Sequence, residues 1–221
     1  MLGKLFGNAM GKPTGRQAAA DADFLPDYDA TYAPLLAQRA AGFRVIFDEL
    51  QQRCRGLGRP GLIVETGSMR APGNWAGDGQ STFLWKAFSD QFPCEIHTID
   101  LDPEAAVVVN EHCGEPVQAH TGDSVAFLHA LASRPKPPQI DLLYLDSYDY
   151  DPHNPFPSAF HHVKELLSVR PCLGKGSIIA IDDNLEMPDG TLLGKGYLAT
   201  QWFDQLGIEC IHRGYQFVWQ L

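Results

Sequence analysis

Positive charge, paired cysteines and long apolar runs are all scarce in this sequence. Lysine and arginine together number 17, against 27 aspartates and glutamates, and the formal net charge is −10. Proteins that bind nucleic acid usually carry a basic stripe, so this balance argues against DNA or RNA as a partner. No apolar run reaches the ~18 residues that a membrane span requires. We therefore expect no membrane partner either.

The five cysteines form no recognisable pair. Their number is odd, they are scattered, and none belongs to a CxxC motif. This pattern is typical of reduced thiols and argues against a disulfide framework or a zinc site. The N-terminal segment lacks an apolar core of signal-peptide length, so we expect a cytoplasmic protein. The oligomeric state is not readable, and a homo-oligomer is compatible with the sequence.

The length of 221 residues suits one domain with a short extension. Residues 1–33 mix glycine, proline, aspartate and alanine without a sustained period, and we interpret them as an N-terminal arm. Helical spacing of apolar residues begins near Pro34 and continues to about Arg55. The glycine-rich segment 56–60 ends this helix. The domain is therefore expected over residues 34–221.

From residue 61 onwards, strand and helix patterns alternate. Such alternation predicts a parallel sheet with helices on both faces. Two further strands are separated by three residues and predict a hairpin. The sequence thus predicts a Rossmann-like α/β fold: a mostly parallel seven-stranded sheet with a C-terminal antiparallel hairpin. The expected strands are 62–65, 95–100, 116–120, 140–146, 177–182, 208–212 and 216–220, and the expected helices are 80–91, 103–112, 123–133, 157–169 and 194–206.

Glycine and acidic residues stand at the tips of the first three strands. Gly67 follows the first strand, where a glycine lets the backbone approach a ligand. Asp100 ends the second strand, and one carboxylate there can accept hydrogen bonds from both hydroxyls of a ribose. Asp123 follows the third strand; it either contacts an adenine amino group or caps the next helix. The candidate cofactor-binding residues are Glu65, Gly67, Ser68, Asp100, Leu101, Asp123, Ser124 and Asp146.

The series ETG, IDLDP and GDS at successive strand tips resembles that of class I S-adenosylmethionine (SAM)-dependent methyltransferases, over roughly residues 60–221. This resemblance implies that the cofactor is SAM. The loop between Gly67 and Gly79 is longer than the compact loop of the family, so the residues that touch the methionine end of SAM stay open.

Carboxylates also end the fourth and fifth strands. Asp146 ends one, and Asp182 and Asp183 end the other, followed by Asn184. Three converging carboxylates repel one another unless a cation neutralises them. Their oxygens suit Mg²⁺, Ca²⁺ or Mn²⁺, and these four residues are the candidate metal ligands. Alternatively, Asp182 or Asp183 caps a turn.

The LD…DD/DN pattern resembles the metal-dependent O-methyltransferases of the catechol and macrocin types. This resemblance implies a divalent metal, most simply Mg²⁺, that orients a hydroxyl of a small-molecule or sugar substrate beside SAM. The sequence departs from the catechol type because Asp149 stands where those enzymes carry a lysine base. The alternatives are a metal-free N- or C-methyltransferase, an aminopropyl transferase, or a non-catalytic Rossmann-like binding protein.

Histidines near the fourth strand are candidates for the missing base. His153 lies in the long loop after that strand, and His161 and His162 lie on the following helix. Histidine titrates near neutral pH and suits general base catalysis. His153 and His162 are the candidate catalytic residues, and the alternative is a surface or packing role.

The apolar spacing of this helix predicts a buried face that His162 borders, with His161 nearer the polar side. The residues that define this expected face are Phe160, Val163 and Leu167. Lys195 is expected to be a solvated lysine at the start of the last helix, or a contact to an acidic substrate.

Overall fold

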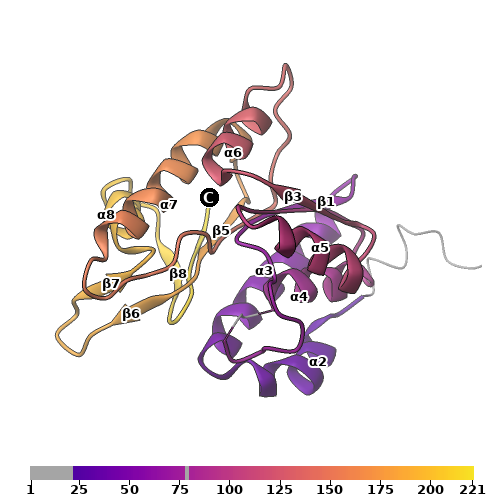
Figure 1. The fold of residues 1–221 in the computed structure, drawn as a ribbon, viewed down its shortest axis with the longest axis horizontal. Helices are drawn as coiled ribbons and strands as arrows, with labels where there is room; N and C mark the ends of the chain where they lie inside the picture. Colours follow the sequence, from indigo (N-terminus) through magenta and orange to yellow (C-terminus); the bar gives the residue numbers. More distant parts are fainter. Residues whose placement is uncertain (1–21, 78–79) are drawn as a thin grey trace, which may run out of the picture.

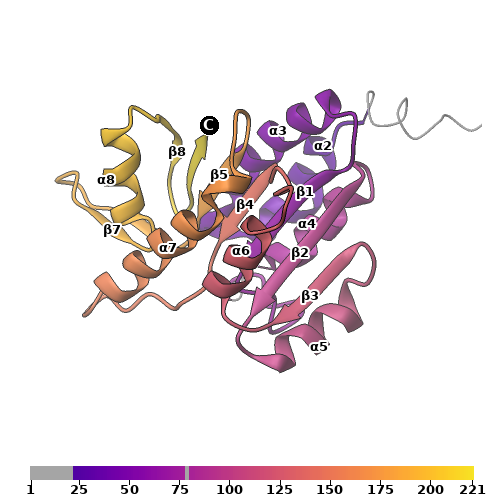
Figure 2. The ribbon, with the colours of Figure 1, turned by 90° about the horizontal axis from the view of Figure 1, so that it is seen from above.

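A sheet of seven strands forms the centre of the molecule (Figure 1, Figure 2). The computed structural model describes residues 22–77 and 80–221. The strands are β1 (Gly61–Thr66), β2 (Cys94–Asp100), β3 (Val117–Thr121), β4 (Leu142–Leu145), β5 (Ile178–Ile181), β8 (Cys210–Arg213) and β9 (Phe217–Gln220). Their order is β3-β2-β1-β4-β5-β9-β8, and only the two pairs that include β9 are antiparallel. The predicted fold class and the C-terminal hairpin are confirmed.

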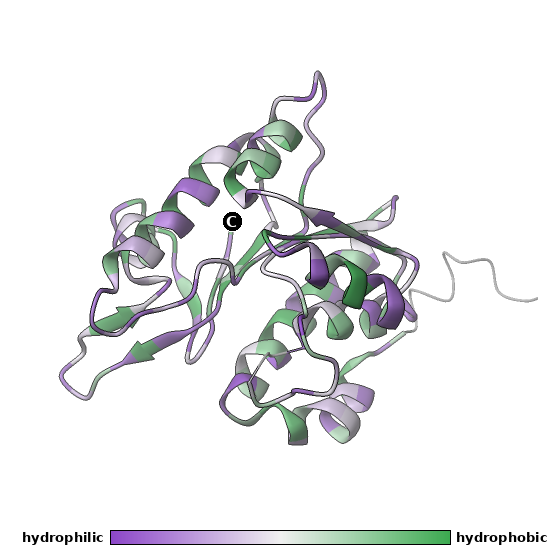
Figure 3. Cartoon of the chain, viewed as in Figure 1, coloured by the Kyte–Doolittle hydropathy of each residue, from purple (hydrophilic) through white to green (hydrophobic). Residues whose placement is uncertain are grey.

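Helices cover both faces of the sheet. On one face, α3 (Ala40–Gly56), α4 (Ser81–Ser89) and α5 (Pro103–His112) enclose one apolar core. On the other, α6 (Ser124–Ala132), α7 (Phe156–Val169) and α8 (Tyr197–Gln205) enclose a second. Figure 3 shows polar and apolar residues alternating along α5 and α7, as expected of helices with one buried side. None of the helices in the described residues is both long and apolar enough to cross a membrane.

The order of the strands reverses at β1. Every residue of β1, β4 and β5 is buried, as parallel strands covered on both faces require. β1 pairs with β2 on one side and with β4 on the other. The strands β2 and β3 therefore extend the sheet in one direction from β1, and β4 and β5 extend it in the opposite direction. At such a switch point the loops separate and leave a crevice beyond the carboxyl ends of the strands.

Part of the expected N-terminal arm belongs to the core. Residues 25–39 form short helical segments, α2 (Leu25–Asp27), η1 (Tyr28–Tyr32), η2 (Ala33–Leu35) and η3 (Ala37–Arg39), before α3 begins. Phe24 and Tyr28 are fully buried, and the Tyr28 hydroxyl donates a hydrogen bond to the Ala40 carbonyl at 2.7 Å. Residues 1–21 of the expected arm lie outside the described residues.

A small hairpin was not predicted from the sequence. It consists of β6 (Asn184–Glu186) and β7 (Leu192–Gly194), and it connects the end of β5 to α8. A short helical turn, η4 (Arg170–Cys172), leads from α7 into β5. The β6–β7 hairpin matters for function because it returns the chain to the carboxyl edge of the sheet at Lys195.

Candidate functional site

A cleft of about 220 Å³ opens at the carboxyl ends of β1, β2, β3 and β4. All the candidate cofactor-binding residues line it except Glu65. The residues expected at the strand tips therefore share one cleft, and their part in cofactor binding stays a prediction. The lining residues are Gly67, Ser68, Arg70, Ser81, Ile99, Asp100, Leu101, Gly122, Asp123, Ser124, Asp146, Ser147, Tyr148, Asp149 and His161.

Gly67 brings the first loop against the end of β4. Its φ is +84°, a conformation that L side chains rarely adopt. A Cβ atom there would lie 2.6 Å from the carbonyl oxygen of Asp146, well inside van der Waals contact. The Gly67 N–H also donates to the Ile99 carbonyl at 2.9 Å. Only glycine can adopt this φ without strain and also lie this close to the Asp146 carbonyl. The loop that begins at Gly67 forms one wall of the cleft.

Asp100 presents a fixed carboxylate to the cleft. Oδ2 accepts a hydrogen bond from the Ser68 N–H at 3.1 Å, and Oδ1 accepts one from the Asp102 N–H at 2.9 Å. Each oxygen keeps further acceptor capacity. A carboxylate held in this way can accept two hydroxyl protons from one ligand, as the geometry of a ribose requires.

Glu65 lies beneath the cleft instead of lining it. Its carboxylate is fully buried and accepts hydrogen bonds from Thr82 Oγ1 at 2.6 Å, Thr98 Oγ1 at 2.6 Å and Trp85 Nε1 at 2.8 Å. Burial raises the pKa of Glu65, and these donors oppose the rise. The side chain thus ties α4 and β2 to β1, so it supports the cleft from below.

Asp123 and Ser124 begin α6 at the far wall. The Asp123 carboxylate accepts a hydrogen bond from the Ala126 N–H at 2.7 Å and caps the helix, which confirms the helix-capping alternative. Ser124 Oγ lies 3.1 Å from Nε2 of His161. Both residues still line the cleft.

The three aspartates converge as predicted, but cationic side chains already contact them. Lys195 Nζ lies 2.6 Å from Asp146 Oδ1 and 2.8 Å from Asp183 Oδ2. Arg39 Nε lies 3.0 Å from Asp182 Oδ2, and its Nη2 lies 3.5 Å from Asp183 Oδ1. The Tyr215 hydroxyl also donates to Asp183. Burial nevertheless raises the pKa of Asp182 above its ordinary value, against the effect of Arg39.

A divalent cation does not fit this arrangement. Oδ1 of Asn184 accepts a hydrogen bond from the Gly196 N–H at 2.7 Å, and its Nδ2 donates to the Ile181 carbonyl at 2.7 Å. Residues 22–77 and 80–221 contain no group of three or more His, Cys, Asp or Glu residues that could hold a metal ion. The four expected metal ligands, Asp146, Asp182, Asp183 and Asn184, therefore lie close together, but donor groups of the protein already bond to their oxygens.

Neither Lys195 nor Arg39 was assigned to this cluster from the sequence. Lys195 was expected to be solvated, yet it is 1% exposed. The glycines on both sides of Lys195 were a sequence signal that the backbone there packs closely against another segment. Arg39 offered no signal, because it lies 143 residues from Asp182 in the sequence.

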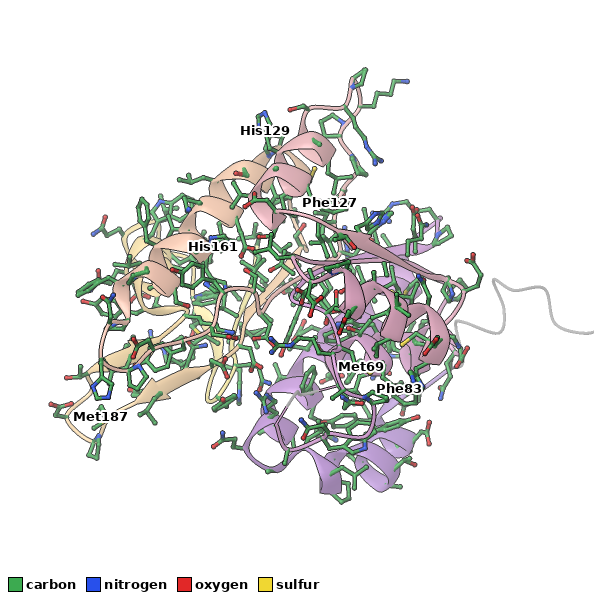
Figure 4. The ribbon with its side chains drawn as sticks, in the orientation of Figure 1. Met69, Phe83, Phe127, His129, His161 and Met187 are labelled. Carbon is green, nitrogen blue, oxygen red and sulfur yellow. The ribbon has the colours of Figure 1, made fainter. Side chains whose placement is uncertain are left out.

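The structure separates the histidines. His153 lies exposed in the loop before α7, and its N–H donates to Asp151. His162 is fully buried, and its Nδ1 lies 2.8 Å from the Ser158 carbonyl. Neither lines the cleft, whereas His161 does. Figure 4 shows His161 on α7 near the middle of the molecule, while Met187 lies at the tip of the β6–β7 hairpin.

The predicted buried face of α7 is wrong. Phe160 and Leu167 are more than half exposed, whereas His162 and Glu165 are fully buried. Ser147 Oγ donates a hydrogen bond to Glu165 Oε1 at 2.7 Å, and His161 Nε2 lies 3.4 Å from the same oxygen. The buried face combines Ala159, Leu166 and Val169 with polar residues that bond to Ser147, to His161 or to a backbone carbonyl. Apolar spacing alone could not reveal this.

No protein-family model matches this sequence, and no curated protein matches it. Among solved structures, the MycE methyltransferase from the mycinamycin biosynthetic pathway, in complex with Mg, SAH and mycinamycin VI, aligns with a TM-score of 0.55 at 16% identity. This chain therefore shares its fold with the aligned part of the MycE methyltransferase. The alignment covers 95% of this chain and 55% of MycE, so this chain spans about half the length of that protein.

Two further structures are similar to this chain. A second MycE crystal form with Mg and SAH gives a TM-score of 0.50 at 14% identity, over 84% of this chain and 52% of MycE. A DhpI–SAH complex matches over 92% of both chains at 16% identity, with a TM-score of 0.43. At these identities the likeness concerns the fold alone.

Proposed function

We propose that this protein is a SAM-dependent methyltransferase that acts on a hydroxyl of a small molecule or sugar. The observation that carries the proposal is the convergence of Gly67, Asp100 and Asp146 in one cleft at the switch point of the sheet. A nucleoside-containing cofactor needs a close backbone approach and a carboxylate for its ribose. This cleft offers both.

In this proposal, the Asp100 carboxylate would hold the ribose hydroxyls. The Gly67–Ser68 backbone would border the methionine end, and Leu101, which is 74% exposed, would cover the adenine. SAM, when bound, supplies an activated methyl group on a sulfonium for attack by a nucleophile. Ser124 would contact the adenine from the α6 side.

A hydroxyl that accepts a methyl group must release its proton, and His161 is suited to take it. Its side chain lines the cleft, and the buried carboxylate of Glu165 lies 3.4 Å behind Nε2. With a proton on Nε2 directed at Glu165, the lone pair on Nδ1 would accept the substrate proton. The candidate bases predicted from sequence, His153 and His162, lie outside the cleft. The aspartates already contact Lys195 and Arg39, which gives no support to metal assistance.

An amine acceptor is the second candidate. Within residues 22–77 and 80–221, the three carboxylates contact two cationic side chains, so the cluster retains a negative charge when all three are ionised. Asp146 carries part of that charge at the wall of the cleft. A negative wall would attract a protonated amine.

Transfer of a labelled methyl group tests the proposal. The protein is incubated with methyl-labelled SAM and, separately, with phenols, sugars, small amines, RNA and a protein mixture. We expect label in a phenol or sugar, with one SAH released per methyl group, and loss of both in Asp100→Ala. Label only in amines would favour the second candidate. Label only in RNA or protein would contradict a small-molecule acceptor.

A further inference from the structure

Lys195 is the most deeply enclosed cation of the carboxyl edge. Its side chain is 2% exposed, and Nζ contacts three oxygens: Asp146 Oδ1 at 2.6 Å, Asp183 Oδ2 at 2.8 Å and the Asp146 carbonyl at 3.1 Å. Nζ therefore sits at the point where oxygens from the ends of β4 and β5 meet. A hard cation at this point would find the same oxygens.

The two glycines that flank Lys195 allow its backbone to lie against the end of β5. Gly194 adopts a φ of +110°, and a Cβ atom there would overlap the carbonyl oxygen of Asp183. A Cβ atom on Gly196 would lie 2.7 Å from Asn184 Oδ1, the atom that accepts the Gly196 N–H. Glycine on both sides thus lets the hairpin lie directly against the end of β5. Lys195 is held between these two contacts and points to Asp146.

The net charge of the carboxylates and Arg39 would favour a cation at the position of Lys195 Nζ. With Arg39 in place but Lys195 absent, three carboxylates would face one positive charge, and a charge of −2 would remain when all are ionised. Asp182 Oδ1 is also buried and has no hydrogen-bond partner among the residues that the structure describes, so the cluster has spare acceptor capacity. A −2 charge on carboxylates that are buried or largely buried is costly unless it is neutralised, and a divalent cation would neutralise it.

We infer that Lys195 is a built-in substitute for a divalent cation, and that its removal opens a divalent-cation site among Asp146, Asp182 and Asp183. The wild-type chain should neither bind such a cation there nor be stabilised by one. The inference concerns cation binding, so it stands or falls separately from methyl transfer.

The test compares wild type, Lys195→Ala and Lys195→Met in Mg²⁺, Ca²⁺ or Mn²⁺ after treatment with EDTA. Both variants should bind one cation in calorimetry. Their melting temperature should rise by about 5–10 °C at a cation concentration ~100 times Kd. Wild type and Lys195→Arg should show neither effect. Lys175→Ala removes an exposed lysine instead and should behave like wild type.

A second substitution locates the cation. Adding Asp146→Asn to Lys195→Ala should abolish cation binding, because it removes a charged ligand. The inference is overturned if the wild type binds a divalent cation and Asp146→Asn weakens that binding. It is equally overturned if neither lysine variant responds to any of the three cations, including the case in which both remain unfolded in their presence.

Discussion

The imidazole of His162 lies 3.9 Å from the carboxylate of Glu165, and both side chains are fully buried. Burial lowers the pKa of His162 from 6.5 to about 4, so the ring is neutral in the folded protein near pH 7. An unfolded chain would bind the proton already near pH 6.5. This pair therefore links the stability of the fold to pH.

The free energy of unfolding should fall as the pH is lowered from 6.5 towards 4. In that window the unfolded chain binds more protons than the folded one at this residue, so acid favours unfolding. Between pH 7 and pH 5 the loss due to His162 is about 2 kcal/mol. Urea unfolding at the two pH values measures it. His162→Gln should lose that part of the pH dependence, and His153→Gln, at an exposed position, should retain it. Equal pH dependence in His162→Gln and wild type would show that His162 does not carry the effect.

Gly67→Ala should damage the cleft more than Gly73→Ala. Both glycines have a positive φ, so both substitutions strain the backbone by about 1 kcal/mol. A Cβ atom at position 73 meets no atom of the described residues within 4 Å, whereas one at position 67 collides with Asp146. Gly67→Ala should therefore cost about 1–3 kcal/mol more in stability and should weaken SAM binding. Thermal unfolding and SAM calorimetry measure the two effects. Indistinguishable variants would rule out the close contact between Gly67 and β4.

His161→Gln should slow methyl transfer to the hydroxyl acceptor by about 100-fold or more, the usual contribution of a general base. Steady-state release of SAH measures the rate once an acceptor is known. His153→Gln is the matched control, because His153 lies outside the cleft, and it should keep the wild-type rate. If His161→Gln is as fast as wild type across the pH range, another group takes the proton.

The strands and their tips could be predicted because local sequence determines them. Continuous apolar runs mark buried parallel strands, and the residues that follow each run fall at one edge of the sheet. Gly67, Asp100 and Asp146 could be placed at this edge in this way. The β6–β7 hairpin was missed because its strands have only three residues each, too few to show a period.

The residues that sequence analysis missed depend on long-range or polar contacts. Arg39 meets Asp182 only because η3 lies against the end of β5, and nothing near Arg39 in the sequence encodes this contact. Glu165 is buried with a hydrogen bond from Ser147 of the preceding loop, and His162 is buried with its Nδ1 beside the Ser158 carbonyl, so a hydrophobic pattern places both at the surface. Phe24 and Tyr28 reach the core from short helical turns that have no sustained period.

Titration of SAM into Asp100→Ala and Asp102→Ala tests the central claim most directly, because the two carboxylates are close in sequence but differ in role. Asp100 lines the cleft, whereas Asp102 caps α5 by accepting a hydrogen bond from the Glu104 N–H at 2.9 Å. Asp100→Ala should weaken SAM binding by at least ~1.5 kcal/mol, about tenfold. Asp102→Ala should lower stability by about 1 kcal/mol and leave SAM affinity unchanged. Wild-type affinity in a folded Asp100→Ala variant, or no SAM binding by the wild type, would contradict the assignment of this cleft.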